Sequence, residues 1–149
     1  MEPAYLTAAA TMVVGLSVAA VAYQQWVLAR HKLRLDLFDQ RYKVYDATVK
    51  FAATIFAHAD FTDEDLRDFN IGTMDAVFLY PQTMKDYLHE FRKRALHMRI
   101  FGRQFEHLPP GEKRSKLVQE NHDELVWLTD QLLALPGLFS PYLGFQSAK

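Results

Sequence analysis

Histidine is the residue type best suited to bind a metal or transfer a proton near neutral pH, and the chain has six of them. They are His31, His58, His89, His97, His107 and His122. No two stand four residues apart, so the H-E-x-x-H arrangement of two ligands on one helical face is absent. The nearest approach to the Glu-x-x-His pairs of di-iron helical bundles is Asp86-x-x-His89, with aspartate for glutamate and no second copy. We therefore expect solvated or helix-capping histidines, and predict no metal or other cofactor.

Other catalytic patterns are equally weak. Asp86 with Glu90, and Glu120 with Glu124, share helical faces, which is ordinary on a solvated helix. There is no glycine-rich phosphate loop and no G-x-S-x-G turn. The chain has no cysteine, which excludes disulfides, thiol catalysis and Cys-rich zinc sites, and its net charge of -1 gives no reason to expect nucleic acid. The sequence predicts no enzyme, no small-molecule substrate and no nucleic-acid partner.

One concentration of basic residues lies in the segment FRKRALHMR and just beyond it. Its members are Arg92, Lys93, Arg94, Arg99 and Arg103. Such a cluster can contact anionic lipid head groups or an acidic partner. It can equally pair with the acidic segment DEDLRD, residues 63–68, of a neighbouring helix or subunit, and a solvated helix face is the usual explanation of such a run.

The elements that must position these residues begin with an apolar segment. From Pro3 to Ala29 there is no charged residue, and about twenty apolar residues in a helix cross a hydrocarbon core of about 30 Å. Tyr5 and Trp26 are roughly 32 Å apart on a helix, which suits aromatic belts at two membrane interfaces. The basic start of a signal peptide is lacking. We predict a transmembrane anchor over residues 1–30; a buried helix of a soluble assembly is the alternative.

Basic residues follow this segment directly: Arg30, His31, Lys32 and Arg34. By the positive-inside rule, the amino terminus is expected outside and residues 31–149 in the cytoplasm.

Small residues recur every four positions within the anchor. They are Thr11, Gly15 and Ala19, with Ala8 on the same side. A stripe of this kind lets two helices approach closely in lipid, so we predict helix association through it. Chance spacing in an alanine-rich span is the alternative.

The remainder of the chain has the periodicity of packed helices. No proline or glycine occurs between Gly15 and Gly72, so one helix is expected to run on from the apolar segment. We expect its core seam at Leu35, Phe38, Tyr42, Tyr45, Val49, Ala52 and Phe56, widened by Leu37, Val44, Phe51 and Ile55.

Three more helices are expected. Thr62 is a good N-cap for a short second helix that is interrupted near Gly72. A third has an inner face of Met84, Leu88, Phe91, Ala95, Met98, Phe101 and Phe105, and a fourth has one of Leu117, Asn121, Leu125, Leu128, Leu132 and Leu135. The fourth is expected to stop at Pro136-Gly137. The short connections predict antiparallel neighbours, and hence an all-α fold with a small cytoplasmic bundle.

The carboxyl-terminal tail, LLALPGLFSPYLGFQSA, is also uncharged. Its prolines and glycines argue against a second spanning helix. Its large apolar residues can cap the bundle or touch the lipid interface: Leu138, Phe139, Tyr142, Leu143 and Phe145. Capping is favoured because aromatic side chains usually bury in the nearest core.

The segment KLRLDLFDQRYKVYDA, Lys32 to Ala47, resembles a motif of small, uncharacterised bacterial membrane-anchored helical proteins. The motif has the form K-L-x-L-x-L-F-D-x-R-[YF]-x-V-Y and follows a membrane helix; such proteins often end near a phrase like LFSPYL, here Leu138 to Leu143. The match is specific from Lys32 to Tyr45 and looser at the tail. The resemblance implies a single-pass protein of the bacterial inner membrane and carries no activity with it.

These features together favour a membrane-tethered helical scaffold or regulatory adaptor that acts through protein contacts and self-associates. The alternative is an accessory subunit of a larger membrane complex, such as a transporter, channel or defence system. The expected partners are membrane lipid and either further copies of the chain or another membrane protein.

Overall fold

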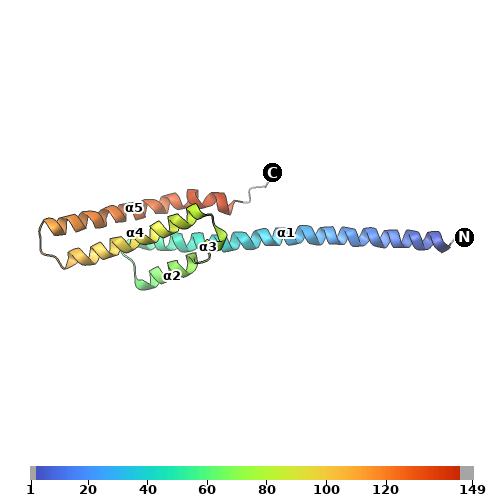
Figure 1. Cartoon of the computed structure of the whole chain (residues 1–149), viewed down its shortest axis with the longest axis horizontal. Helices are drawn as coiled ribbons and strands as arrows, with labels where there is room; N and C mark the ends of the chain where they lie inside the picture. The colour runs from blue at the N-terminus through green and yellow to red at the C-terminus, as the bar shows by residue number, and fades with distance from the viewer. Residues whose placement is uncertain (1–2, 145–149) are drawn as a thin grey trace. The chain divides into compact units, whose positions relative to one another are not determined.

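The computed structural model describes residues 3–144, with side chains from Thr7 onward except that of Ala10. Its helices are α1 Pro3–His58, α2 Asp63–Thr73, α3 Ala76–Leu79, α4 Gln82–Glu106 and α5 Glu112–Leu143 (Figure 1). No strand occurs within these residues, so the predicted all-α class is confirmed. The chain divides into two units between Phe38 and Asp39, inside α1. The predicted boundary after residue 30 marks the end of a membrane segment, and it stays a prediction.

The end of α1 and the start of α2 are determined by local chemistry. Ala59 leaves the helix with φ of 53° while its amide donates to the carbonyl of Ile55 at 2.8 Å. Thr62 then caps α2: its hydroxyl accepts from the Asp65 amide at 3.1 Å, and the Asp65 carboxylate accepts from the Thr62 amide at 2.7 Å. The Thr62 hydroxyl also donates to the Asp65 carboxylate at 2.7 Å, and this bond, with the one from the Thr62 amide, holds the pKa of Asp65 below its usual range. The predicted N-cap at Thr62 is confirmed.

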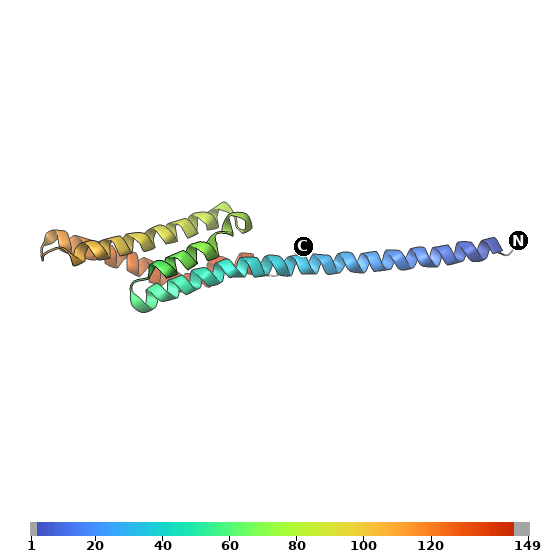
Figure 2. The ribbon, with the colours of Figure 1, turned by 90° about the horizontal axis from the view of Figure 1, so that it is seen from below.

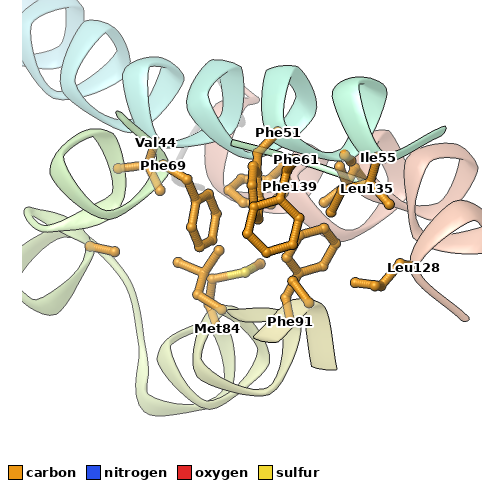
Figure 3. Packing of buried hydrophobic residues seen from close by; sticks show 14 of the residues in the cluster. Val44, Phe51, Ile55, Phe61, Phe69, Met84, Phe91, Leu128, Leu135 and Phe139 are labelled. Carbon is orange, nitrogen blue, oxygen red and sulfur yellow. The ribbon is translucent and has the colours of Figure 1, made fainter. Parts of the chain in front are cut away.

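The core of the second unit is centred on four phenylalanines from four segments of the chain. Phe51 of α1 stacks on Phe69 of α2 with ring centroids 4.8 Å apart, and lies 6.2 Å from Phe91 of α4 and 5.0 Å from Phe61 of the α1–α2 loop (Figure 3). Leu128, Leu135 and Phe139 of α5 complete the core and are fully buried.

The buried face of α1 agrees with the predicted seam only in part. Ala52 of the seam is buried, as are Val44, Phe51 and Ile55 of its predicted widening and also Thr48, whereas Leu35, Tyr42 and Phe56 are exposed. Val44, Thr48, Phe51 and Ile55 are themselves spaced by four, three and four residues, but a threonine interrupts their apolar pattern. The Thr48 hydroxyl donates to the Val44 carbonyl at 2.8 Å, so the group is satisfied within its own helix and can be buried without an unpaired polar atom.

α4 and α5 form a helical hairpin (Figure 1). The predicted inner face of α4 is buried at Met84, Leu88, Phe91, Ala95 and Met98, and half-buried at Phe101 and Phe105.

The predicted end of the last helix at Pro136-Gly137 is wrong, because α5 continues through Pro136 and Pro141 to Leu143. Each proline removes one helical hydrogen bond. Burial offsets that loss: Phe139 is fully buried, and Tyr142 and Leu143 pack partly buried against the core. The tail therefore caps the core as expected, although Leu138 is exposed and Phe145 lies outside the described residues.

Figure 2 shows α2 alongside the second half of α1, and Gly72 of α2 lies against Ala47 of α1. A Cβ atom at Gly72 would lie 2.4 Å from the Cβ of Ala47, closer than two carbon atoms can pack. Any side chain at position 72 must therefore push α2 away from α1.

Gly72→Ala is expected to lower the free energy of unfolding by about 1–2 kcal/mol, because overpacking outweighs the gain in helix propensity. Gly102→Ala is the matched control, since Gly102 is also helical but its added Cβ would make an ordinary contact 3.5 Å from Asn121. The control should stabilise by up to about 1 kcal/mol. Urea unfolding of both variants measures the difference; equal effects at the two positions would contradict this packing.

Candidate functional site

Arg41 bonds to two segments that lie 38 and 101 residues further along the chain. Its Nε donates to the carbonyl of Leu79 at 3.2 Å, and its Nη1 donates to the carbonyl of Tyr142 at 3.1 Å. Leu79 is the last residue of α3, and Tyr142 lies in the last turn of α5. Carbonyls at helix ends have no partner within the helix and carry partial negative charge. One guanidinium therefore satisfies the ends of two helices.

Aromatic side chains surround this contact. Tyr80 donates its hydroxyl to the backbone carbonyl of Arg41 at 2.8 Å, and burial raises the pKa of that hydroxyl. The Tyr80 ring lies 5.6 Å from Phe139 and 5.3 Å from Tyr142, and Phe139 in turn lies 5.3 Å from Tyr45. We call these six residues the Arg41 joint: Arg41, Tyr45, Leu79, Tyr80, Phe139 and Tyr142.

The Arg41 joint brings together two segments that the sequence analysis singled out. Arg41 and Tyr45 belong to the segment Lys32–Tyr45, and Phe139 and Tyr142 belong to LFSPYL. No carboxylate among residues 3–144 forms an ion pair with Arg41, so its charge faces only carbonyl dipoles and rings. Such an arrangement supports no proton transfer; it is suited to holding α1, α3 and α5 together within the second unit.

Sequence reasoning missed Leu79 and Tyr80 as members of this joint. Tyr80 precedes Pro81, and a residue before proline is driven out of the helical region. Tyr80 adopts φ of -128° and ψ of 152°, which ends α3 and leaves the Leu79 carbonyl available to Arg41. The Tyr-Pro pair was the available indication.

The predicted basic cluster does not form a single surface. Arg94 donates to Glu90 at 2.8 Å and to Glu124 at 3.2 Å, and lies 4.5 Å over the Trp127 ring. Its guanidinium therefore links α4 to α5.

Arg99 is also engaged within the chain. It pairs with Asp63 and lies 5.0 Å over the ring of Phe61, and its hydrogen bond holds the pKa of Asp63 below its usual range. The pairing of a basic residue with the acidic segment 63–68, one of the alternatives drawn from the sequence, is thus present at Arg99.

The other three basic residues are exposed. Lys93 lies 3.7 Å from Glu90, a distant surface pair, whereas Arg92 and Arg103 form no ion pair within residues 3–144. A lipid or acidic-partner contact stays a prediction for Arg92, Lys93 and Arg103, and the paired guanidiniums of Arg94 and Arg99 are less available for it.

The small-residue stripe lies on the exposed surface of the first unit. Thr11, Gly15 and Ala19 are all exposed, and the Thr11 hydroxyl donates to the Thr7 carbonyl at 2.8 Å. Nothing lies within 4 Å of a Cβ atom added at Gly15.

The histidines and carboxylates form no group able to hold a metal ion within residues 3–144. Asp86, the carboxylate of the Asp86-x-x-His89 pair, accepts a hydrogen bond from Gln82 at 2.8 Å.

Fold and site together describe an all-α protein. Its helix α1 carries an exposed apolar segment in the first unit and contributes to the core of the second unit, where Arg41 bonds to the ends of α3 and α5. No protein-family model, curated protein or solved structure matches the chain.

Proposed function

We propose that the chain is a membrane-tethered helical scaffold or regulatory adaptor of the bacterial inner membrane. The observation that carries this proposal is that the most apolar part of α1 is exposed. Its most apolar 18-residue window is long and apolar enough to cross a bilayer, and none of that window is buried. Exposed apolar surface of this extent is costly in water and favourable in lipid.

The flank of the apolar segment supports the same reading. Tyr23 and Trp26 lie with ring centroids 6.0 Å apart, and the Arg30 guanidinium sits 3.8 Å over the Trp26 ring. Aromatic residues suit a membrane interface and basic residues suit its cytoplasmic side, which supports our proposal of an amino terminus outside and an antiparallel helical bundle in the cytoplasm. Tyr5, the other predicted aromatic belt, has a side chain outside the described residues.

In this proposal the Arg41 joint stabilises the unit that binds partners. Arg41 holds α1, α3 and α5 together within the second unit, so partners meet a folded surface. Self-association through the small-residue stripe would place two bundles side by side.

Crosslinking in native membranes, followed by affinity purification and mass spectrometry, tests this function. A ladder of multiples of the chain supports the scaffold. A different protein captured in a constant ratio supports the accessory subunit of a transporter, channel or defence complex instead. Recovery of the uncrosslinked chain alone would contradict both.

Gly15→Leu is expected to weaken self-association in membranes about tenfold, because a large side chain stops two helices from approaching closely. The single helix has room for leucine, so the variant should keep its fold. Ala20→Leu is the matched control, because Ala20 is exposed about 140° around the helix from Gly15. Crosslinked dimer yield is the measurement, and equal yields from both variants and the unaltered chain would rule out this stripe as the interface.

A further inference from the structure

The end of the second unit where α1 enters carries an unusual surface of exposed apolar side chains. Phe78 is 85% exposed, Met74 68% and Val77 53%. All three lie in or beside α3, which ends at Leu79 and is held to Arg41.

Basic residues border these side chains. Lys85, His89 and Arg92 follow one face of α4 at spacings of four and three residues, and they line a hollow of about 420 Å³ together with Met74 and Val77. None of the three forms an ion pair with a carboxylate within residues 3–144. We call the six residues the amphipathic edge: Met74, Val77, Phe78, Lys85, His89 and Arg92.

Three carboxylates lie close to the amphipathic edge in sequence. Asp75 is exposed between Met74 and Ala76, Asp86 accepts a hydrogen bond from Gln82, and Glu90 pairs with Lys93 and Arg94. None of the three is among the residues that line the hollow, whose charged lining is Lys85 and Arg92 with the titratable His89.

We propose that the amphipathic edge docks on the head groups of anionic phospholipid. Exposed aromatic and aliphatic side chains next to unpaired basic residues are the pattern that peripheral membrane surfaces use. This proposal rests on the proposed function, because the bilayer must already be near.

The anchor and the second unit are close together in sequence. Ten residues separate Ala29, the last of the uncharged segment, from Asp39, the first of the second unit, and they rise about 15 Å in a helix. The Leu79 carbonyl and the Tyr80 hydroxyl both bond to Arg41, only two residues further along α1. The amphipathic edge thus belongs to the end of the second unit that is covalently nearest to the anchor.

Docking would contribute affinity from both kinds of residue. Each basic residue near an anionic surface strengthens binding about fivefold at physiological salt. Lys85→Gln with Arg92→Gln should therefore weaken docking about thirtyfold. Both positions lie at the surface of α4, so the double variant is expected to fold normally.

The absence of cysteine allows a direct test on the full chain. Val77→Cys carries a nitroxide label at the amphipathic edge, and Val118→Cys carries one near the other end of α5 as the control. The protein is reconstituted into vesicles of phosphatidylcholine, with or without 30% phosphatidylglycerol. Collision of each label with oxygen and with a water-soluble nickel chelate reports its depth.

Docking predicts that the label at position 77 is shielded from nickel only in vesicles with phosphatidylglycerol, and that the Lys85 and Arg92 double variant or high salt removes the shielding. The label at 118 should stay in water throughout. A label at 77 that is aqueous in both vesicles, or shielded equally in both, overturns the proposal. Shielding that disappears on dilution of protein in lipid assigns the edge to a second copy and also overturns it.

Failure of the proposed function is a separate result. A chain that does not float with vesicles in a density gradient lacks the anchor, which overturns both proposals. A chain that floats with an aqueous label at 77 overturns only the docking of the amphipathic edge.

Discussion

Arg41→Met is expected to lower the free energy of unfolding of the second unit by about 3 kcal/mol, with a fall in Tm of roughly 10 °C. The methionine keeps most of the apolar stem of the arginine but has no hydrogen to donate. The carbonyls of Leu79 and Tyr142 then lose their charged partner. Hydrogen bonds to a charged group contribute about 1.5–3 kcal/mol each, and partial burial reduces their sum.

Urea unfolding of the detergent-solubilised full chain measures this loss. With Trp26→Phe in the background, emission comes from Trp127, which packs against Phe91 in the core. Lys43→Met is the matched control, because it removes one positive charge from an exposed position two residues away. Its effect should stay within about 0.5 kcal/mol. An Arg41→Met variant as stable as this control would mean that the joint does not hold the helices.

Arg41→Lys separates charge from geometry. Lysine keeps the positive charge near the ends of α3 and α5, but a single ammonium cannot reproduce a planar fork that reaches two carbonyls. We expect the free energy of unfolding of Arg41→Lys to lie between that of the unaltered chain and that of Arg41→Met. A lysine variant as unstable as methionine would show that the fork matters and the charge does not.

Helix positions in this chain follow from local chemistry and could be predicted. The absence of proline and glycine from residues 16–71 gives the long α1, and the Thr62 cap with Asp65 gives the start of α2. The inner face of α4 is a regular apolar stripe, so its burial also follows from periodicity.

The errors arise where tertiary contacts outweigh local preference. Thr48 reads as polar, yet its bond to Val44 lets it face the core and moves the buried stripe of α1. Pro136 reads as a stop, yet burial of Phe139 carries α5 onward. Neither outcome can be read from the residue itself, because each depends on which side chains lie opposite.

The Arg41 joint is a similar case. The segment that contains Arg41 and the tail phrase that contains Tyr142 were both singled out in the sequence, but their contact was not predicted. A guanidinium bonded to backbone carbonyls leaves no complementary charge elsewhere in the chain to reveal the pairing. The basic cluster shows the converse, since clustered residues of one helix have different surroundings in space. Arg94 pairs with Glu124 of α5 and Arg99 with Asp63 of α2, whereas Arg92 and Arg103 form no ion pair within residues 3–144.

Val14→Arg with Val18→Arg is expected to move the chain from the membrane fraction to the soluble or aggregated fraction. Arginine near the middle of a spanning helix costs about 2.5–3.5 kcal/mol on insertion scales, so two disfavour insertion about 10⁴-fold. Val14 and Val18 are 61% and 63% exposed, and no residue of the apolar window is buried, so the core of the second unit is untouched.

Alkaline extraction of membranes, followed by immunoblotting of both fractions, measures the shift. Val118→Arg with Val126→Arg is the matched control, because it adds the same charges at valines that are 42% and 44% exposed on α5. The control should remain in the membrane, as should the unaltered chain. The intact mass of the unaltered chain then separates the remaining possibilities. A chain found in membranes but shortened at its amino terminus contains a cleaved signal sequence. A chain found at full length in the soluble fraction uses α1 as a helix of a soluble assembly. Either result would contradict the anchor, because an anchor requires the full-length chain to resist extraction and only the variant with arginines inside the span to lose that resistance.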